Sequence, residues 1–127
     1  MRAWTYAAYG GPEVLESSTM DAPVPAAGQV LISVEVAGLT PADWHFMRGE
    51  PTMIRAVAGF GAPKPPAIIG SDVAGIVTAI GEGVTAFEPG ADVYGDNLDL
   101  KGGFAEYAVA PASALAIKPA ELTFVEA

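Results

Sequence analysis

A match to a dinucleotide-binding fingerprint lies at residues 81–86. The stretch reads Gly-Glu-Gly-Val-Thr-Ala and follows a run of strand-forming residues, 73–80. It fits GxGxxA, a form of the glycine-rich motif whose backbone approaches the pyrophosphate of a dinucleotide. A functional match requires these glycines to open a helix whose N-terminal N–H groups meet the phosphates.

The residues after the match favour a turn instead. The required helix would run from Val84, and Pro89-Gly90 would end it after about one turn, because proline cannot continue a helix. We therefore interpret Gly81 and Gly83 as positions of positive φ in a connection that leaves the strand. Residues 88–92, Glu-Pro-Gly-Ala-Asp, predict a second turn before the next strand.

The other candidate catalytic residues give little support to metal chemistry or hydrolysis. The chain has no cysteine, and its single histidine, His45, lies two positions after Asp43, with which it could nominally share a metal ion. A solvent-facing helical histidine is the simpler interpretation. Asp96 and Asp99 could form a carboxylate pair for acid-base catalysis. A solvated turn explains them better, because Gly, Asp and Asn cluster around them.

Hydride transfer requires none of these groups. It needs no protein nucleophile, because a reduced nicotinamide delivers the hydride while the protein orients and polarises the acceptor.

The composition describes one acidic domain. The 127 residues suffice for a single packed core. With 15 acidic and 6 basic residues the net charge is −9, which repels nucleic acid and anionic membranes, so we expect neither as a partner. The lack of cysteine agrees with a reducing compartment. The sequence shows no apolar signal core and no run long enough to span a membrane, so we expect a cytoplasmic protein.

Hydrophobic periodicity predicts a mainly β structure. Residues 29–38 alternate apolar and polar faces like a half-buried strand, and residues 72–80 are apolar on both faces, like a central strand between two layers. Weaker strand signals cover residues 2–8, 15–20, 92–94, 103–110 and 115–118. Short strands and turns at this spacing indicate an antiparallel barrel or sandwich.

One short helix is predicted after Thr40. Thr40 can cap it, Pro41 fits its first position, Asp43 lies in its first turn and Gly49 can end it. Residues 59–67 are too rich in Gly and Pro for a strand and predict a loop.

A second helix start lies at the end of the sequence. Thr123 and Glu126 match a capping box, yet only Ala127 follows. Because one helical turn is unstable alone, the match is either a chance one in a frayed tail or a sign that this polypeptide is the front part of a longer one.

Several motifs, in order, resemble the medium-chain dehydrogenase/reductase superfamily. Residues 70–95, GSDVAGIVTAIGEGVTAFEPGADVYG, are similar to the stretch in which zinc alcohol dehydrogenases carry GHExxGxV, a turn and PGDxV. Residues 34–49, VEVAGLTPADWHFMRG, resemble the segment with a zinc cysteine in zinc members and Asn-Pro or Thr-Pro in quinone-oxidoreductase-like members. Residues 102–127 resemble the strands and helix start before the nucleotide domain. The resemblance covers essentially the whole sequence.

The resemblance implies a fold and a domain boundary. The fold is a GroES-like, partly open antiparallel β-barrel with one or two short helices, forming one domain over residues 1–127. The Rossmann domain would be absent from this chain, as would the later segment that completes the catalytic domain. Truncation, natural or engineered, would then explain the unfinished helix at Thr123.

The resemblance also implies an enzyme without catalytic zinc or any other metal. Thr40 stands where the zinc cysteine would be, Ser71 where the histidine would be, and Asp72 in place of the acid. Catalytic zinc takes three protein ligands from Cys, His, Asp or Glu.

The resemblance places the cofactor side of the site at Thr40 and Pro41. The Thr40 hydroxyl would lie near the nicotinamide or the substrate oxygen, and Pro41 would fix the loop, although a helix N-cap alone also explains Thr40. Asp43 matches a family acid that supports this loop, and stabilisation of the helix dipole explains it equally well.

The remaining site candidates are three aromatic residues and one acid. Trp44, Phe46 and Tyr94 could line an apolar acceptor cleft, with core packing as the alternative for each. We expect Asp72 to be a partly buried acid that supports the loop through hydrogen bonds with neighbouring backbone.

We therefore expect the substrate-side domain of a zinc-free oxidoreductase that uses NADP or NAD to reduce a quinone or an activated alkene or carbonyl. The isolated chain should bind no cofactor and should not turn over, because the nucleotide would be held by the absent domain. The alternative is a stand-alone GroES-like binding or assembly module without redox activity. Apolar surface left by the missing segments should drive self-association unless a nucleotide-binding domain covers it.

Overall fold

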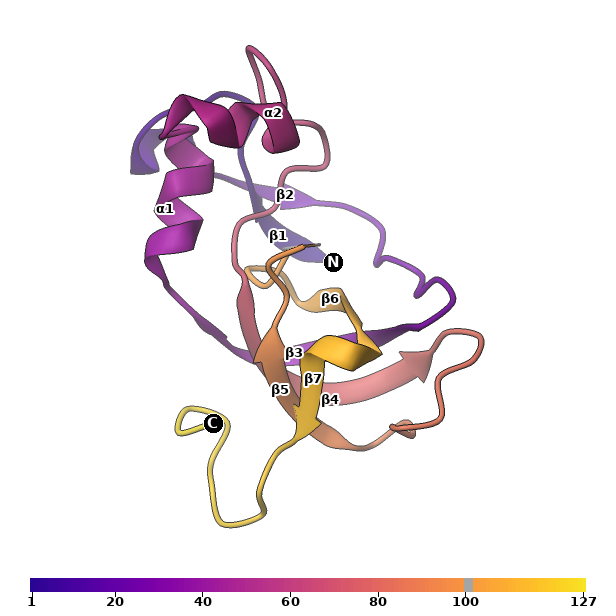
Figure 1. Ribbon diagram of the computed structural model, residues 1–127. Helices are drawn as coiled ribbons and strands as arrows, with labels where there is room; N and C mark the ends of the chain where they lie inside the picture. The colour runs from indigo at the N-terminus through magenta and orange to yellow at the C-terminus, as the bar shows by residue number, and fades with distance from the viewer. Residues whose placement is uncertain (100–101) are drawn as a thin grey trace.

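A computed structural model describes residues 1–99 and 102–127 (Figure 1). Within these ranges the chain forms seven strands and two short α-helices. The elements are β1 (Arg2–Thr5), β2 (Glu16–Thr19), β3 (Gln29–Gly38), α1 (Pro41–Arg48), α2 (Arg55–Ala58), β4 (Asp72–Ile80), β5 (Asp92–Asp96), β6 (Tyr107–Pro111) and β7 (Leu115–Ile117). No helix in the described ranges combines the length and apolar character needed to cross a bilayer.

The strands form two antiparallel sheets that do not close into a barrel. The larger sheet has the order β6-β3-β4-β5-β7, and the smaller one pairs β1 with β2. Isolated bridges from Ala3 to Ala105 and from Thr5 to Ile68 join β1 to the rest of the chain. The structure confirms the predicted mainly β, partly open GroES-like architecture. The weakly signalled strands all form, but β1 ends at Thr5 and not at residue 8, and β6 begins at Tyr107 and not at residue 103.

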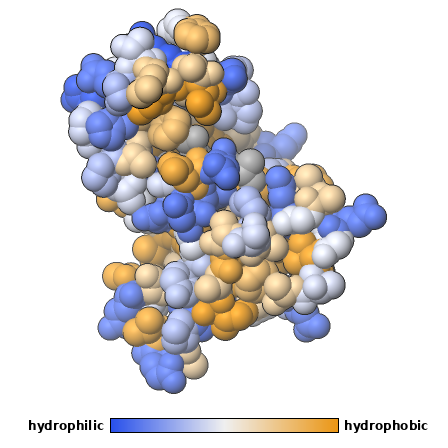
Figure 2. Space-filling view, in the orientation of Figure 1, coloured by the Kyte–Doolittle hydropathy of each residue, from blue (hydrophilic) through white to orange (hydrophobic). Residues whose placement is uncertain are grey.

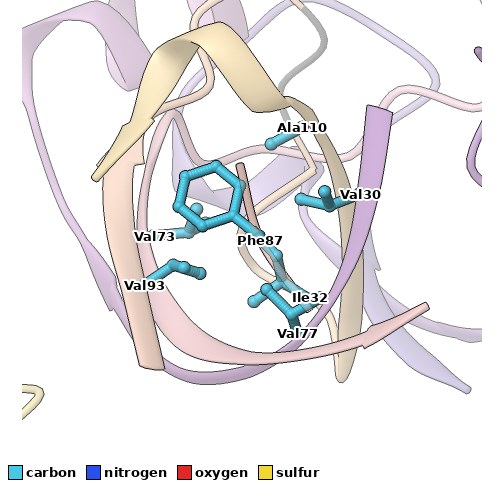
Figure 3. Packing of buried hydrophobic residues seen from close by; sticks show 7 residues of the cluster. All are labelled: Val30, Ile32, Val73, Val77, Phe87, Val93 and Ala110. Atoms are coloured by element: carbon cyan, nitrogen blue, oxygen red, sulfur yellow. The ribbon is translucent and has the colours of Figure 1, made fainter. Parts of the chain in front are cut away.

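The core lies on the concave side of the larger sheet. The Phe87 ring, which comes from the connection between β4 and β5, packs among the aliphatic side chains of the sheet (Figure 3). Those side chains belong to Val30, Ile32, Val73, Val77, Val93 and Ala110. Val30 and Ile32 occupy alternate positions of β3, as the period-two pattern predicts.

The prediction that β4 is central is confirmed, but the prediction that both its faces are covered holds only for its first half. Val73, Ala74 and Gly75 are buried, whereas Thr78 and Ile80 are exposed. The reason is register: β5 pairs with β4 only as far as Ile76, so the second half of β4 extends beyond its neighbour.

Residues 81–86 form a turn and not the start of a helix. The Gly28 N–H donates to the Glu82 carbonyl at 2.9 Å, which ties the turn to the segment before β3. Gly83 has a φ of 81°, as expected. The expected positive φ at Gly81 is wrong: glycine is needed there because a Cβ would lie 1.8 Å from the Ala26 carbonyl oxygen. The predicted second turn also forms, with Gly90 at a φ of 95°.

Candidate functional site

The Asp43 carboxylate joins the start of α1 to the residue before β4. Asp43 is 3% exposed. Its Oδ2 accepts the Thr40 N–H at 2.8 Å and the Thr40 hydroxyl at 3.3 Å. Its Oδ1 accepts the Ser71 N–H at 3.0 Å and the Ser71 hydroxyl at 3.3 Å. One buried carboxylate therefore satisfies donors from two segments that are far apart in sequence.

The helix that carries Asp43 begins and ends as its sequence predicts. Thr40 is the N-cap with extended backbone, Pro41 occupies the first turn, and Gly49 ends the helix with a φ of 64°. The Asp43 carboxylate returns to the Thr40 N–H, as in one half of a capping box. Because α1 is fixed in this way, the position of the Thr40 hydroxyl is fixed as well.

The hydroxyls of Thr40 and Ser71 lie side by side, with their oxygens 3.3 Å apart. Each also contacts Asp43 at 3.3 Å, which is long for a hydroxyl donor. A hydroxyl has one proton to donate, so the Thr40 hydroxyl can donate to Asp43 or to a ligand oxygen. Breaking its long hydrogen bond to Asp43 costs little free energy. Ser71 is 3% exposed and Thr40 is half-buried, so the Thr40 hydroxyl is the one of the pair that is suited to polarise an oxygen of a small molecule.

A cleft of about 360 Å³ lies near this junction in the chain, and its described lining includes neither Thr40 nor Ser71. We call it the Asp72 cleft. Gly38, two residues before Thr40, pairs with Asp72, the residue after Ser71, and both of these paired residues line the cleft. Its walls come from the ends of β3, β4 and β5 and from the C-terminal tail, and they include Gly38, Asp72, Tyr94, Asp96, Phe124 and Val125.

Asp72 and Asp96 place two carboxylates on one wall of this cleft. The two residues pair in the register of β4 and β5. Partial burial, followed by the charges of Asp96 and Asp43, raises the pKa of Asp72. Asp72 is partly buried as predicted, but the predicted backbone hydrogen bonds are wrong: none of the described residues donates a hydrogen bond to its carboxylate.

The substitution Asp72→Asn is expected to stabilise the chain near neutral pH. A raised pKa means that the folded state favours the protonated acid, so the wild type loses stability as pH rises through the range where Asp72 ionises. Like charges opposite each other in a sheet cost roughly 0.2–1 kcal/mol, and solvent screening favours the low end. The measurement is urea unfolding at several pH values.

The gain in the free energy of unfolding from Asp72→Asn should shrink toward pH 3–4, where aspartates become protonated (usual pKa about 3.9). Asp21→Asn, at an exposed position, is the matched control and should show a smaller gain. A destabilised Asp72→Asn variant at neutral pH would show that this carboxylate makes a favourable contact in the fold.

The C-terminal wall of the cleft is held by Lys118. This lysine is 8% exposed. Its ammonium donates to the carbonyls of Leu122 at 2.6 Å and Pro119 at 3.2 Å, lies 3.8 Å from Asp92 Oδ2, and stacks 5.1 Å from the centre of the Phe124 ring. The tail therefore wraps around a buried cation, and Phe124 is held against the cleft.

The predicted capping box in the tail forms. The Glu126 carboxylate accepts the Thr123 N–H at 2.8 Å and its hydroxyl at 3.0 Å, and the Glu126 N–H donates to the Thr123 hydroxyl at 3.3 Å. These bonds lower the pKa of Glu126.

Replacing Lys118 with methionine should detach the tail. Methionine keeps an apolar stem but removes the ammonium, so the Leu122 and Pro119 carbonyls lose a charged donor worth roughly 1–3 kcal/mol. We expect hydrogen exchange to accelerate selectively in residues 119–127. Lys64→Met is the matched control, because Lys64 is exposed and donates to one carbonyl, that of Val57. Unchanged exchange in the Lys118→Met tail would contradict this role.

The three predicted aromatic site residues lie in different places. Tyr94 lines the Asp72 cleft. Phe46 lines a second cleft of about 150 Å³ with Tyr6, Lys64 and residues around them. Trp44 is 42% exposed, and Arg48 stacks over its ring at 5.7 Å. The structure therefore brings only Tyr94 next to Asp72.

His45 does not face Asp43. Its ring stacks on Trp44, with 4.0 Å between the ring centres, and its Nδ1 lies 2.8 Å from the Glu50 carbonyl oxygen. The Nδ1 proton of His45 is therefore donated to the Glu50 carbonyl, just after the end of α1. The His45 side chain is half-buried, so it is less exposed to solvent than we predicted.

The donors at the hydroxyl pair do not suit a zinc ion. Thr40 and Ser71 offer neutral hydroxyls, which are not among the usual protein ligands of zinc. Both hydroxyls and both Asp43 oxygens are also engaged with one another. Within residues 1–99 and 102–127, no group of three or more His, Cys, Asp or Glu side chains could hold a metal ion.

Comparison with known proteins identifies relatives over almost the whole chain. Residues 26–120 match the model of the alcohol dehydrogenase GroES-like domain. A quinone oxidoreductase from Lama guanicoe is 39% identical over 125 residues, which are 98% of this chain and 35% of that protein. The chain thus spans about a third of the length of this relative.

Two solved structures show the same fold. A quinone oxidoreductase from Coxiella burnetii superposes with a TM-score of 0.87 at 26% identity, covering 99% of this chain and 39% of that chain. A mycobacterial protein solved with NADPH has a TM-score of 0.80 at 32% identity, covering 98% and 35%.

Proposed function

Because this chain belongs to the alcohol dehydrogenase GroES-like domain family, we propose that it is the substrate-side domain of an NAD(P)H-dependent oxidoreductase. The proposed reaction reduces a quinone or an activated alkene or carbonyl. The observation that carries this proposal is the Thr40–Ser71 hydroxyl pair on Asp43, together with a cleft that is lined by Asp72, the residue after Ser71. The names of the relatives support the quinone as acceptor, and the mycobacterial complex supports NADPH.

In the proposed reaction, bound nicotinamide supplies the hydride. The acceptor oxygen gains negative charge as the hydride arrives, and a hydroxyl donor stabilises that charge best when it is already in place. Thr40 is such a donor, because its backbone N–H is held by Asp43 and its hydroxyl is held only by long bonds. Solvent then supplies the proton that completes the reduced product.

The other site residues take supporting roles in this proposal. Pro41 keeps the first turn of α1 rigid behind Thr40, and Asp43 orients both hydroxyls. Tyr94 contacts the acceptor in the Asp72 cleft, and Asp72 supports the loop through its pairing with Gly38. Contacts of Trp44 and Phe46 with the acceptor stay predictions.

We also propose that the enzyme works without zinc and that the dinucleotide is held outside residues 1–127. The hydroxyl pair supports the first statement, and the turn at residues 81–86 supports the second, because a fingerprint without its helix lacks the N–H groups that bind pyrophosphate.

Calorimetric titration of the isolated chain with NADPH tests this proposal. We expect no saturable heat and no NADPH oxidation when a quinone is added. Saturable binding with sub-millimolar affinity, or sustained oxidation of NADPH, would show that residues 1–127 hold the nucleotide themselves. Either result would overturn the proposal that the dinucleotide is held outside these residues.

We further propose that the isolated chain self-associates. Apolar surface lies over α2 and the loop after it, at the top of Figure 2. Phe60 is 83% exposed and Met53 is 76% exposed, and contiguous apolar surface seldom stays uncovered. In sedimentation velocity, the fraction of a faster-sedimenting oligomer should increase with protein concentration. This fraction should be smaller for the Phe60→Ser variant. A monomer at every concentration would contradict self-association.

A further inference from the structure

We propose that the Asp72 cleft selects for electrically neutral acceptors and rejects anionic ones, and that Asp72 and Asp96 are the specificity-determining residues. This inference rests on the proposed function, since it concerns the acceptor of that reaction. It follows from the charges that line the cleft and from the engagement of the nearest buried cation.

The described walls of the cleft carry negative charge without a compensating cation. Asp72 and Asp96 face each other across β4 and β5. Among residues 1–99 and 102–127, the lining contains no lysine, arginine or histidine. Burial raises the pKa of Asp72 most, and the charge of Asp96 and then that of the buried Asp43 raise it further.

The nearest buried cation is already engaged. Lys118 donates to two backbone carbonyls of the tail. Its third partner is the negatively charged Asp92, which lies outside the cleft. An anionic ligand would therefore enter next to two carboxylates, with no cation among the described lining residues to pair with it. Like-charge contacts at a binding surface cost several kcal/mol when desolvated and less in an open cleft.

The rest of the lining suits a flat apolar molecule. The rings of Tyr94 and Phe124 and the aliphatic side chains of Val36 and Ala74 provide apolar surface, and Asp72, the residue after Ser71, lies at the polar end of the lining. A neutral quinone or enone matches this combination of apolar walls and one polar end. A divalent cation does not, because the described residues hold no cluster of three ligands.

The test compares two naphthoquinones that differ in charge. Amide spectra of the isolated chain are followed while 2-methyl-1,4-naphthoquinone or 1,4-naphthoquinone-2-sulfonate is added. The chain has no cysteine, so thiol alkylation does not interfere. We expect the neutral quinone to shift the amides of Gly38, Ala74 and Gly95, and the sulfonate to bind at least tenfold more weakly. Added salt should narrow this difference by screening.

Charge variants assign the effect to the cleft. Asp72→Asn combined with Asp96→Asn should bring the sulfonate within about threefold of the neutral quinone. The matched control combines Asp21→Asn with Glu88→Gln, which changes the net charge equally at exposed positions outside the cleft. This control should leave the tenfold difference in place.

Each remaining outcome overturns a distinct statement. Equal affinity for the two quinones would overturn the charge selection and leave the proposed function standing. A difference that survives in the Asp72/Asp96 variant, or disappears in the control, would overturn the assignment to these two residues. Absence of cleft shifts with either quinone would overturn the proposed acceptor site, and the selection inferred from it would fall with it.

Discussion

Replacing Asp43 with alanine is expected to lower the free energy of unfolding by about 3–5 kcal/mol. The substitution leaves the backbone N–H groups of Thr40 and Ser71 without an acceptor, and both lie at a buried junction. Each buried donor without a partner costs roughly 1–3 kcal/mol, and bonds to a charged acceptor are the stronger kind. Urea unfolding followed by the fluorescence of Trp4 and Trp44 measures the loss.

Two further substitutions separate this role from a general effect of charge. Asp43→Asn keeps one acceptor oxygen but points an NH₂ group at existing donors, so we expect a loss of about 1–3 kcal/mol. Asp72→Asn removes a neighbouring charge and is expected to stabilise. A loss below 1 kcal/mol for Asp43→Ala would mean that this carboxylate does not hold α1 to β4.

The second large effect concerns the Thr40 hydroxyl. It requires a complete enzyme, which a chimera provides: residues 1–127 replace the matching domain of the Lama guanicoe quinone oxidoreductase, the relative that is 39% identical. In this chimera, Thr40→Val should lower kcat/KM for the quinone roughly 10–100-fold, because loss of one donor to a developing oxyanion costs at least this much. Thr40→Ser, which keeps the hydroxyl, should retain most of the rate.

NADPH affinity and thermal unfolding of these variants serve as controls. Both should change little in Thr40→Val relative to Thr40→Ser, because the Thr40 N–H remains available to Asp43 in each. Equal rates for the Val and Ser variants would show that Thr40 acts only as a helix cap.

Much of the fold could be predicted because its signals are local. The helix after Thr40 follows from a cap, a proline and a terminal glycine. The turn at residues 81–86 follows from Pro89-Gly90, which leave no room for a helix. What failed needed tertiary information: the exposure of Thr78 and Ile80 depends on where β5 stops pairing, and the need for glycine at position 81 depends on the Ala26 carbonyl.

The site was harder to predict because its contacts join distant segments. The sequence pointed to Thr40, Asp43 and Asp72, but the bonds between Asp43 and Ser71 depend on how α1 meets β4. The pairing of Asp72 with Asp96 was missed because the predicted strand stopped at residue 94, two positions short of the β5 end.

The cation at the tail was missed for a similar reason. Lys118 lies in an ordinary Lys-Pro pair, and nothing in the sequence tells that its ammonium is buried against Leu122 and Phe124. A capping box within a tail rich in apolar residues was the available signal that this segment is ordered.

The most direct test of the account is quinone-dependent oxidation of NADPH by the chimera, measured beside its parent enzyme and beside residues 1–127 alone. We predict that the chimera oxidises NADPH when a neutral quinone is present and that the isolated chain does not. A chimera that binds NADPH as its parent does, yet reduces no quinone, enone or carbonyl, would contradict the claim that this chain provides the substrate side of a reductase.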